Sequence, residues 1–170
     1  MRYKKIIAIL MLIPVMLTCF ACGNSAANDG SNNETVNIEG DLQEIMSQIY
    51  ADLDGVDAER KETMQGYITD VLTEDNEQAM LGTEDIDYIE GIVSVPMISA
   101  IAYQCVLLRV NPDDVEDIKQ KLKDNADLNK WVCVSAETVL VENVGDVILF
   151  IMSDQDVAYA VSSAFQSLGK

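Results

Sequence analysis

The chain of 170 residues contains no histidine. It therefore has no imidazole metal ligand, no Ser-His or Cys-His nucleophile pair, and no histidine to act as a general base near neutral pH. The G-x-S-x-G, P-loop, G-x-G-x-x-G and H-E-x-x-H motifs are also absent. We therefore expect no metal, no cofactor and no catalytic residues in this protein.

Basic residues are scarce as well. Eleven Lys and Arg residues stand against 29 Asp and Glu residues, which gives a net charge of −18. A chain this acidic is repelled by phosphate backbones, so we expect no binding to nucleic acid. The length allows one ordinary domain with short appendages.

The first 21 residues have the composition of a lipoprotein signal peptide. A basic head over residues 1–5 is followed by an uncharged apolar run over residues 6–20, and then by Ala21 and Cys22. A small residue directly before a cysteine suits lipoprotein processing, which attaches a lipid to the thiol and cleaves the chain before it. We expect cleavage between Ala21 and Cys22, with Cys22 carrying the lipid.

Two alternatives compete with this interpretation. Cys19 is a second acceptor for lipid, but Thr18 before it is a poorer residue at a cleavage site. The apolar run could also stay in place as a membrane anchor, but its 15 residues are fewer than the ~20 needed to span a bilayer, and Pro14 interrupts it. Either route leaves the domain on the outer face of the membrane.

Residues 22–38 are rich in Asn, Ser, Gly and Ala and contain no aromatic residue. Such a segment buries too little apolar surface to offset the entropy of ordering, which predicts a flexible tether. Beyond residue 21, eight basic residues face 29 acidic ones, a net charge of −21. We expect an extracytoplasmic protein of the cell membrane, with membrane lipid as its partner through the anchor.

Residues 39–170 carry the patterns of a single α+β domain. Apolar residues first recur at helical spacing and later alternate or run continuously, as strands do. Helices are predicted at 39–54, 74–81, 111–123 and 153–168, and strands at 88–95, 98–110 and 147–152. Residues 131–134 and 138–142 are predicted to form two further strands or one bulged strand. Residues 56–73 fit neither type clearly. Short turns between the strands favour a mainly antiparallel sheet of four to five strands with amphipathic helices packed on it.

Three signals refine this prediction. Gly82 is expected to end a helix in the left-handed conformation. Asn111, followed by Pro112 and two acids, is expected to begin one. The run at 98–110 is apolar on both alternating faces, which is typical of a central strand covered on both sides.

Residues 81–168 resemble the DUF4358 domain, a family of small clostridial lipoproteins with no assigned function. The match is carried by the segments at 81–82, 85–88, 96–99, 101–102, 106–110, 130–134, 141–143 and 151–154. Family members also share the lipoprotein signal and polar tether. Tyr103 stands where many members have His, and 127–129 reads Asp-Leu-Asn instead of Asp-Pro-Arg. An activity that needed that His or Arg would be absent here.

Four residues are candidates for a surface or binding role: Trp131, Lys130, Tyr103 and Arg109. Trp131, the only tryptophan, follows Lys130 near a predicted strand start. Aromatic residues are enriched at binding sites, although packing in the core is their more common role. Arg109 is expected to pair with an acid at one end of the sheet.

Cys105 and Cys133 both lie in predicted strands. A disulfide between neighbouring strands is one alternative outside the cell. We favour two small buried thiols, because free cysteine is among the most buried residue types. The acidic cluster at 52–57 lacks the Gly and Glu that an EF-hand loop requires, so no calcium site is predicted there.

We therefore expect a non-catalytic accessory or interaction domain with a protein partner in the cell envelope. The alternative is a lipoprotein that binds a small molecule or glycan, which a deep apolar pocket at Trp131 or Tyr103 would favour. An enzyme ranks third, and would need two carboxylates within catalytic distance beside Tyr103 or Lys130.

Overall fold

The structure, a computed structural model, describes residues 37–170. The predicted signal peptide, Cys22 and most of the predicted tether lie outside the described residues. Within them, no helix is both long enough and apolar enough to cross a membrane. The elements, in chain order, are α1 (Leu42–Ala51), α2 (Ala58–Gln65), β1 (Ile68–Val71), α3 (Glu77–Leu81), β2 (Glu90–Val95), β3 (Gln104–Arg109), η1 (Pro112–Asp114), α4 (Val115–Asn125), β4 (Thr138–Val144), β5 (Val147–Ser153) and α5 (Gln155–Ser167).

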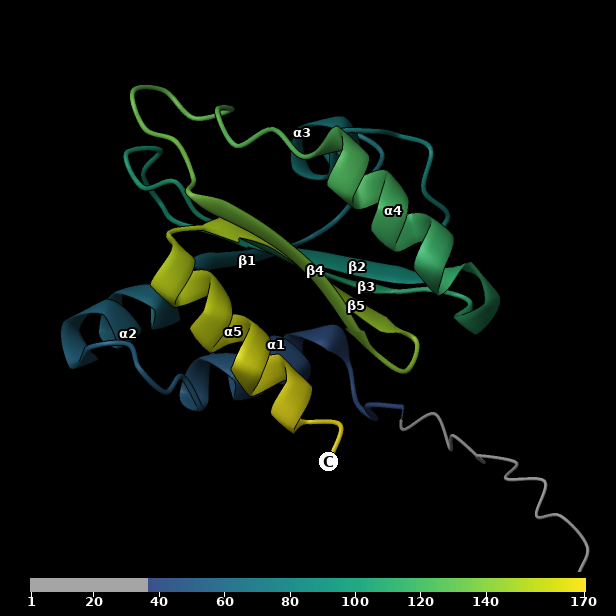
Figure 1. The fold of residues 1–170 in the computed structure, drawn as a ribbon, viewed down its shortest axis with the longest axis horizontal. Helices are drawn as coiled ribbons and strands as arrows, with labels where there is room; N and C mark the ends of the chain where they lie inside the picture. Colours follow the sequence, from purple (N-terminus) through teal and green to yellow (C-terminus); the bar gives the residue numbers. More distant parts are fainter. Residues whose placement is uncertain (1–36) are drawn as a thin grey trace, which may run out of the picture. The chain divides into compact units, whose positions relative to one another are not determined.

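The five strands form one antiparallel sheet in the order β1-β2-β3-β5-β4 (Figure 1). The predicted hairpin between β4 and β5 is present and turns at Gly145, whose φ is positive. The sheet and the helices packed on it confirm the predicted α+β domain.

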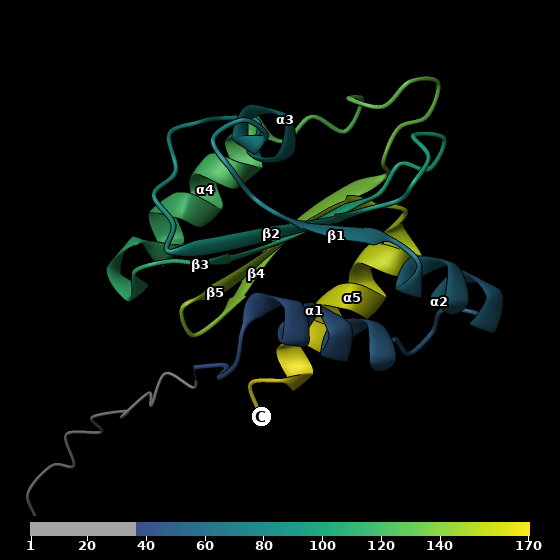
Figure 2. The same cartoon turned by 180° about the vertical axis from the view of Figure 1, so that it is seen from behind.

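Helices cover both faces of this sheet (Figures 1 and 2). The face that carries Cys105 and Leu107 packs under α1, α2 and α5. The opposite face carries Val106 and Leu108 and packs under α3 and α4. Because successive side chains of a strand point to opposite faces, a strand covered on both sides needs an unbroken apolar run. The expectation of a covered central strand is therefore confirmed for β3.

The predicted strand at 98–110 is too long, because only Gln104–Arg109 forms a strand. Residues Ile101, Ala102 and Tyr103 instead form a turn, in which the Tyr103 amide donates to the Ile101 carbonyl, and they pack into the two cores. Burial in a loop produces the same apolar pattern as burial in a strand.

The predicted strand at 131–134 is wrong. Residues 126–137 form a loop in which the Ala136 amide donates to the Leu128 carbonyl. Cys133 has a φ of 67°, in the left-handed region, which an extended strand does not allow. The apolar residues around it belong to a loop surface and not to the sheet.

Capping signals were more informative than periodicity at the helix ends. Gly82 ends α3 with a φ of 79°, as predicted. A helical segment does begin at Pro112, first as a 3₁₀ turn, but the Asn111 side chain bonds the Asp114 carboxylate and not a backbone amide. The unclear segment at 56–73 divides into α2 and the edge strand β1.

Arg109, the last residue of β3, binds the segment before α1 at the start of the described domain. Its guanidinium donates to the Gly40 carbonyl at 2.9 Å and lies 3.2 Å from the Asp146 carboxylate and 3.8 Å from Glu90. The expected pairing of Arg109 with an acid at a sheet end is confirmed. The chain therefore enters the domain at the Arg109 end of β3, opposite its Gln104 end.

Candidate functional site

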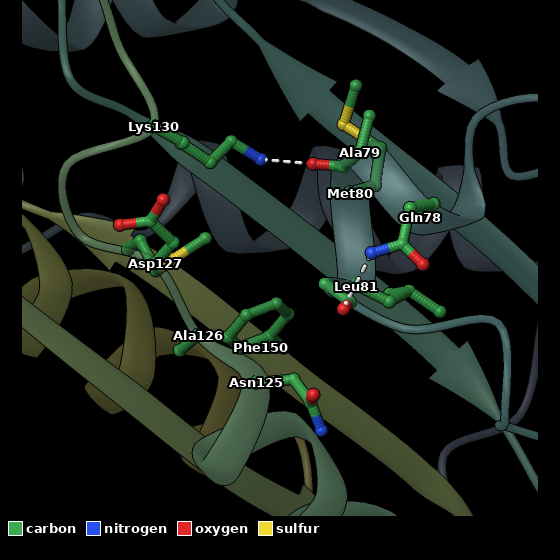
Figure 3. A pocket seen from close by; sticks show the side chains of 11 residues that line it. Gln78, Ala79, Met80, Leu81, Asn125, Ala126, Asp127, Lys130 and Phe150 are labelled. Atoms are coloured by element: carbon green, nitrogen blue, oxygen red, sulfur yellow. Dashed lines mark hydrogen bonds between the residues drawn. The ribbon is translucent and has the colours of Figure 1, made fainter.

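Two hollows lie near the end of the sheet where β2 stops and β3 begins, and both are lined by Met80 and Lys130. The α3–α4 hollow has a volume of about 380 Å³ and lies between the C-terminal ends of these helices (Figure 3). The loop hollow has a volume of about 340 Å³ and is lined mainly by apolar side chains of two loops, together with Gln104 at the start of β3. Its remaining residues are Val95, Pro96, Met97, Ser99, Tyr103 and Trp131.

Lys130 is shared by the two hollows. Its Nζ donates to the Ala79 carbonyl and to the Gln104 Oε1, each at 2.5 Å, and lies 5.5 Å from the centre of the Trp131 ring. Figure 3 shows the side chain reaching from its loop toward Ala79 of α3. The residue as a whole is exposed, but its ammonium group meets a glutamine that is completely buried. The ammonium group is thus drawn toward the protein, which is the reverse of the usual arrangement, in which a lysine buries its stem and keeps its charge in water.

Gln104 is held in a single orientation by a second hydrogen bond. Its Nε2 donates to the Met80 carbonyl at 2.7 Å, which leaves Oε1 to accept from Lys130. Ala79 and Met80 belong to the last turn of α3, where carbonyls have no partner within the helix. Lys130 and Gln104 therefore cap α3, and a cation also suits this end of the helix dipole.

The charge of Lys130 has no direct counter-ion in the part of the chain that the structure describes. Within the described residues Lys130 forms no ion pair, whereas Lys119 and Lys121 each bridge to acids on or near α4. Burial lowers the pKa of Lys130 to about 8, and the carboxylate of Asp127 on the same loop opposes part of this change. An ammonium that bonds only neutral acceptors is open to an anionic partner.

Tyr103 lies in the core, with 2% of its surface exposed. Its hydroxyl shares a hydrogen bond of 2.7 Å with the Tyr50 hydroxyl, and its ring lies 4.8 Å from the ring of Tyr67. Burial raises the pKa of Tyr103 well above its usual range, so the phenol stays neutral. Tyr103 contributes to the loop hollow from the core side and is not a surface residue.

The other candidates occupy different places. Trp131 is half-buried in the loop hollow, next to the exposed side chain of Val132. Arg109 lies at the opposite end of β3 and is engaged in structural contacts. Cys105 and Cys133 form no disulfide within residues 37–170. Cys105 is buried in β3, as expected, but Cys133 is exposed, so the expectation of two buried thiols was wrong for Cys133.

The hollows offer little for catalysis. Asp127 is the only carboxylate among their lining residues, so the two carboxylates that a glycosidase-like mechanism needs do not meet there. Elsewhere in residues 37–170, no group of three or more Cys, Asp or Glu side chains is arranged to hold a metal ion. The arrangement of neutral acceptors, one cation and apolar walls suits binding.

Sequence reasoning missed two residues of this site, Gln104 and Met80. Gln104 did carry a signal, because it is the one amide within the apolar run at 98–110. A polar side chain in a buried strand needs a partner, and here the partners come from α3 and from the loop after α4. No local pattern indicates that these segments meet.

Comparison of the chain with protein-family models, with curated proteins and with solved structures found no match.

Proposed function

We propose that this chain is a lipid-anchored, extracytoplasmic protein of the cell envelope, and that its folded domain binds a ligand without transforming it. The observation that supports binding is the loop hollow, which is lined by both Trp131 and Tyr103. A pocket of a few hundred Å³ with apolar walls and a few polar groups is typical of small-molecule sites. The resemblance to the DUF4358 family remains a prediction, as does a protein partner in the envelope.

The position of the hollows supports this proposal. The chain enters the domain at the Arg109 end of β3, and the hollows lie at its Gln104 end, which a strand of this length separates by about 17 Å. Met97, at the rim of the loop hollow, has 77% of its surface exposed. The hollows thus lie at the end of β3 opposite the point where the proposed anchor joins the domain.

Ligand binding is tested with the protein from Gly23 onward, titrated with neutral oligosaccharides, amino acids, short peptides and fatty acids. Trp131 is the only tryptophan, so its fluorescence reports directly on the loop hollow. We expect at least one class to shift the emission and to raise the melting temperature, because a ligand that binds only the folded state stabilises it. A flat response to all classes would reject the proposal.

Two exposed positions at opposite ends of β2 provide a matched pair of variants. Met97→Glu places a charge at the rim of the loop hollow, whereas Ile89→Glu places it at the far end of the strand, where the side chain is 64% exposed. Binding in the hollow requires that Met97→Glu weakens it and that Ile89→Glu does not. Equal effects of the two variants would show that the ligand binds elsewhere.

The anchor is tested separately. We expect the protein isolated from its host membranes to begin at a lipid-modified Cys22, which mass spectrometry of the N-terminal peptide detects. A Cys22→Ser variant should no longer sediment with membranes. An unprocessed N-terminus at Met1, or unchanged sedimentation of the variant, would refute the lipid anchor.

A further inference from the structure

Lys130 has one hydrogen-bond donor that residues 37–170 do not use. An ammonium group has three N–H donors, and two of them are taken by the Ala79 carbonyl and the Gln104 amide. The third has no hydrogen-bond acceptor within the described residues. Lys130 lines both hollows, so a molecule in either one would lie beside its side chain.

Within residues 37–170 the charge of Lys130 also has no carboxylate in direct contact, although Asp127 lies on the same loop. Beyond residue 21 the chain has a net charge of −21, yet Lys130 has neutral atoms as its direct partners. Charged groups at sites shielded from water are normally paired, because desolvation is otherwise unfavourable. Capping of α3 explains why the side chain points inward, but it explains neither the spare donor nor the space on both sides of it.

The walls of the loop hollow indicate what would accompany an anionic group. Val95, Pro96, Met97 and the Trp131 ring are apolar, and the side chains of Ser99 and Trp131 form no hydrogen bond within the described residues. A ligand there would gain by burying an apolar portion against these side chains. A single positive charge in a strongly acidic protein favours a monoanion over a phosphate or another multivalent anion.

We infer that the ligand is a monocarboxylic acid, with its carboxylate bound to Lys130 Nζ and an apolar portion of amino-acid or short acyl size in the loop hollow. This inference rests on the proposed ligand-binding function. It names the charge and size of the ligand, and two sources share this chemistry: the C-terminus of a peptide and a short fatty acid.

The test uses matched pairs of probes that differ only in charge. N-acetyl-leucine and N-acetyl-leucinamide represent a peptide terminus, and octanoate and octanamide represent a fatty acid. Each is titrated into the full-length protein in a nonionic detergent at pH 7, with Trp131 emission as the readout. We expect at least one acid to bind ten-fold or more tightly than its amide, and the tighter acid identifies the source.

Lys130 is then replaced to test whether it causes the preference for the charged ligand. Lys130→Met keeps an apolar stem without the charge, and it should reduce the preference for acid over amide to less than two-fold. Lys130→Arg should retain part of the preference. Lys123→Met, on the exposed side of α4, removes a lysine away from the hollows and should change nothing.

Several outcomes would overturn the inference. Equal binding of acid and amide to the unaltered protein would overturn it, and this result does not depend on the folding of any variant. A Lys130→Met variant that still preferred the acid over the amide would also overturn it. Binding of neither acid below about 10 mM, a free energy near −3 kcal/mol, would also reject it. If neutral ligands still bound and Met97→Glu still blocked them, the proposed function would stand while the carboxylate was rejected. No binding by any class would reject both.

Discussion

Gly82 offers the sharpest test of how the α3–α4 hollow is built. It ends α3 with a φ of 79°, and a Cβ added to it would lie 2.2 Å from the carbonyl oxygen of Asn125 at the end of α4. Gly55 has nearly the same conformation, with a φ of 82°, but an added Cβ there would meet no atom within 4 Å. Replacing each by alanine therefore separates conformational strain from collision.

The expected magnitudes follow from these two terms. An L residue in the left-handed region costs about 1–2 kcal/mol relative to glycine, and both variants incur this cost. At Gly82 the backbone of α3 must also move away from Asn125, and such overpacking typically adds about 1–3 kcal/mol. We expect Gly55→Ala to lower the free energy of unfolding by about 1–2 kcal/mol and Gly82→Ala by about 2–5 kcal/mol.

Urea unfolding of the protein from Gly23 onward, followed by circular dichroism and extrapolated linearly to water, measures both values. Trp131 emission followed in the same titration shows whether the hollow opens before the sheet unfolds. If the two variants were destabilised equally within about 0.5 kcal/mol, α3 would not press against Asn125, and this account of the hollow would be refuted.

Three further predictions concern single side chains. Binding of a carboxylic acid should weaken as the pH rises from 7 to 9.5, because Lys130, with a pKa of about 8, then loses its charge. Asp127 and Tyr103 are the other titratable groups lining the hollows, and burial raises the pKa of Tyr103 so that its phenol stays neutral; a flat pH profile would contradict this prediction. Iodoacetamide should label Cys133 in the folded protein and Cys105 only after unfolding, since burial raises the pKa of Cys105 to about 12; equal labelling of both would refute it. Ser94→Ala should leave stability unchanged or raise it by up to about 1 kcal/mol, because the buried Ser94 hydroxyl forms no hydrogen bond within residues 37–170; a loss of stability would contradict this prediction.

Signals that act over a few residues predicted local structure well. The left-handed end of α3 needed only a glycine after a helical pattern, and the β4–β5 hairpin needed only a turn between two apolar runs. The fold class followed because strand pairs with short connections leave few arrangements other than an antiparallel sheet. The helix end, the hairpin and the fold class depend on residues that are close together in the sequence, so the sequence pattern alone was enough to predict them.

Apolar sequence, in contrast, was mistaken for strand structure in two places, at 98–103 and at 131–134. Ala102 and Tyr103 pack into the cores, and Trp131 lines the loop hollow. Ile98 and Val132 are exposed, and neither segment pairs with another strand. Periodicity records which side chains avoid water, but the hydrogen bonds of the backbone decide whether a segment is a strand.

The sequence alone determined the lack of histidine chemistry and the α+β class, and it is the basis of the proposed lipid anchor, because each depends on composition or on short spacings. Only the tertiary structure decided that Lys130, Gln104 and the end of α3 meet. These residues are 24 to 51 positions apart in their hydrogen-bonded pairs, and the contact arises from the packing of α3 and the loop after α4 at one end of the sheet. A site assembled by packing has no signature in any one segment, so its chemistry became visible only in the fold.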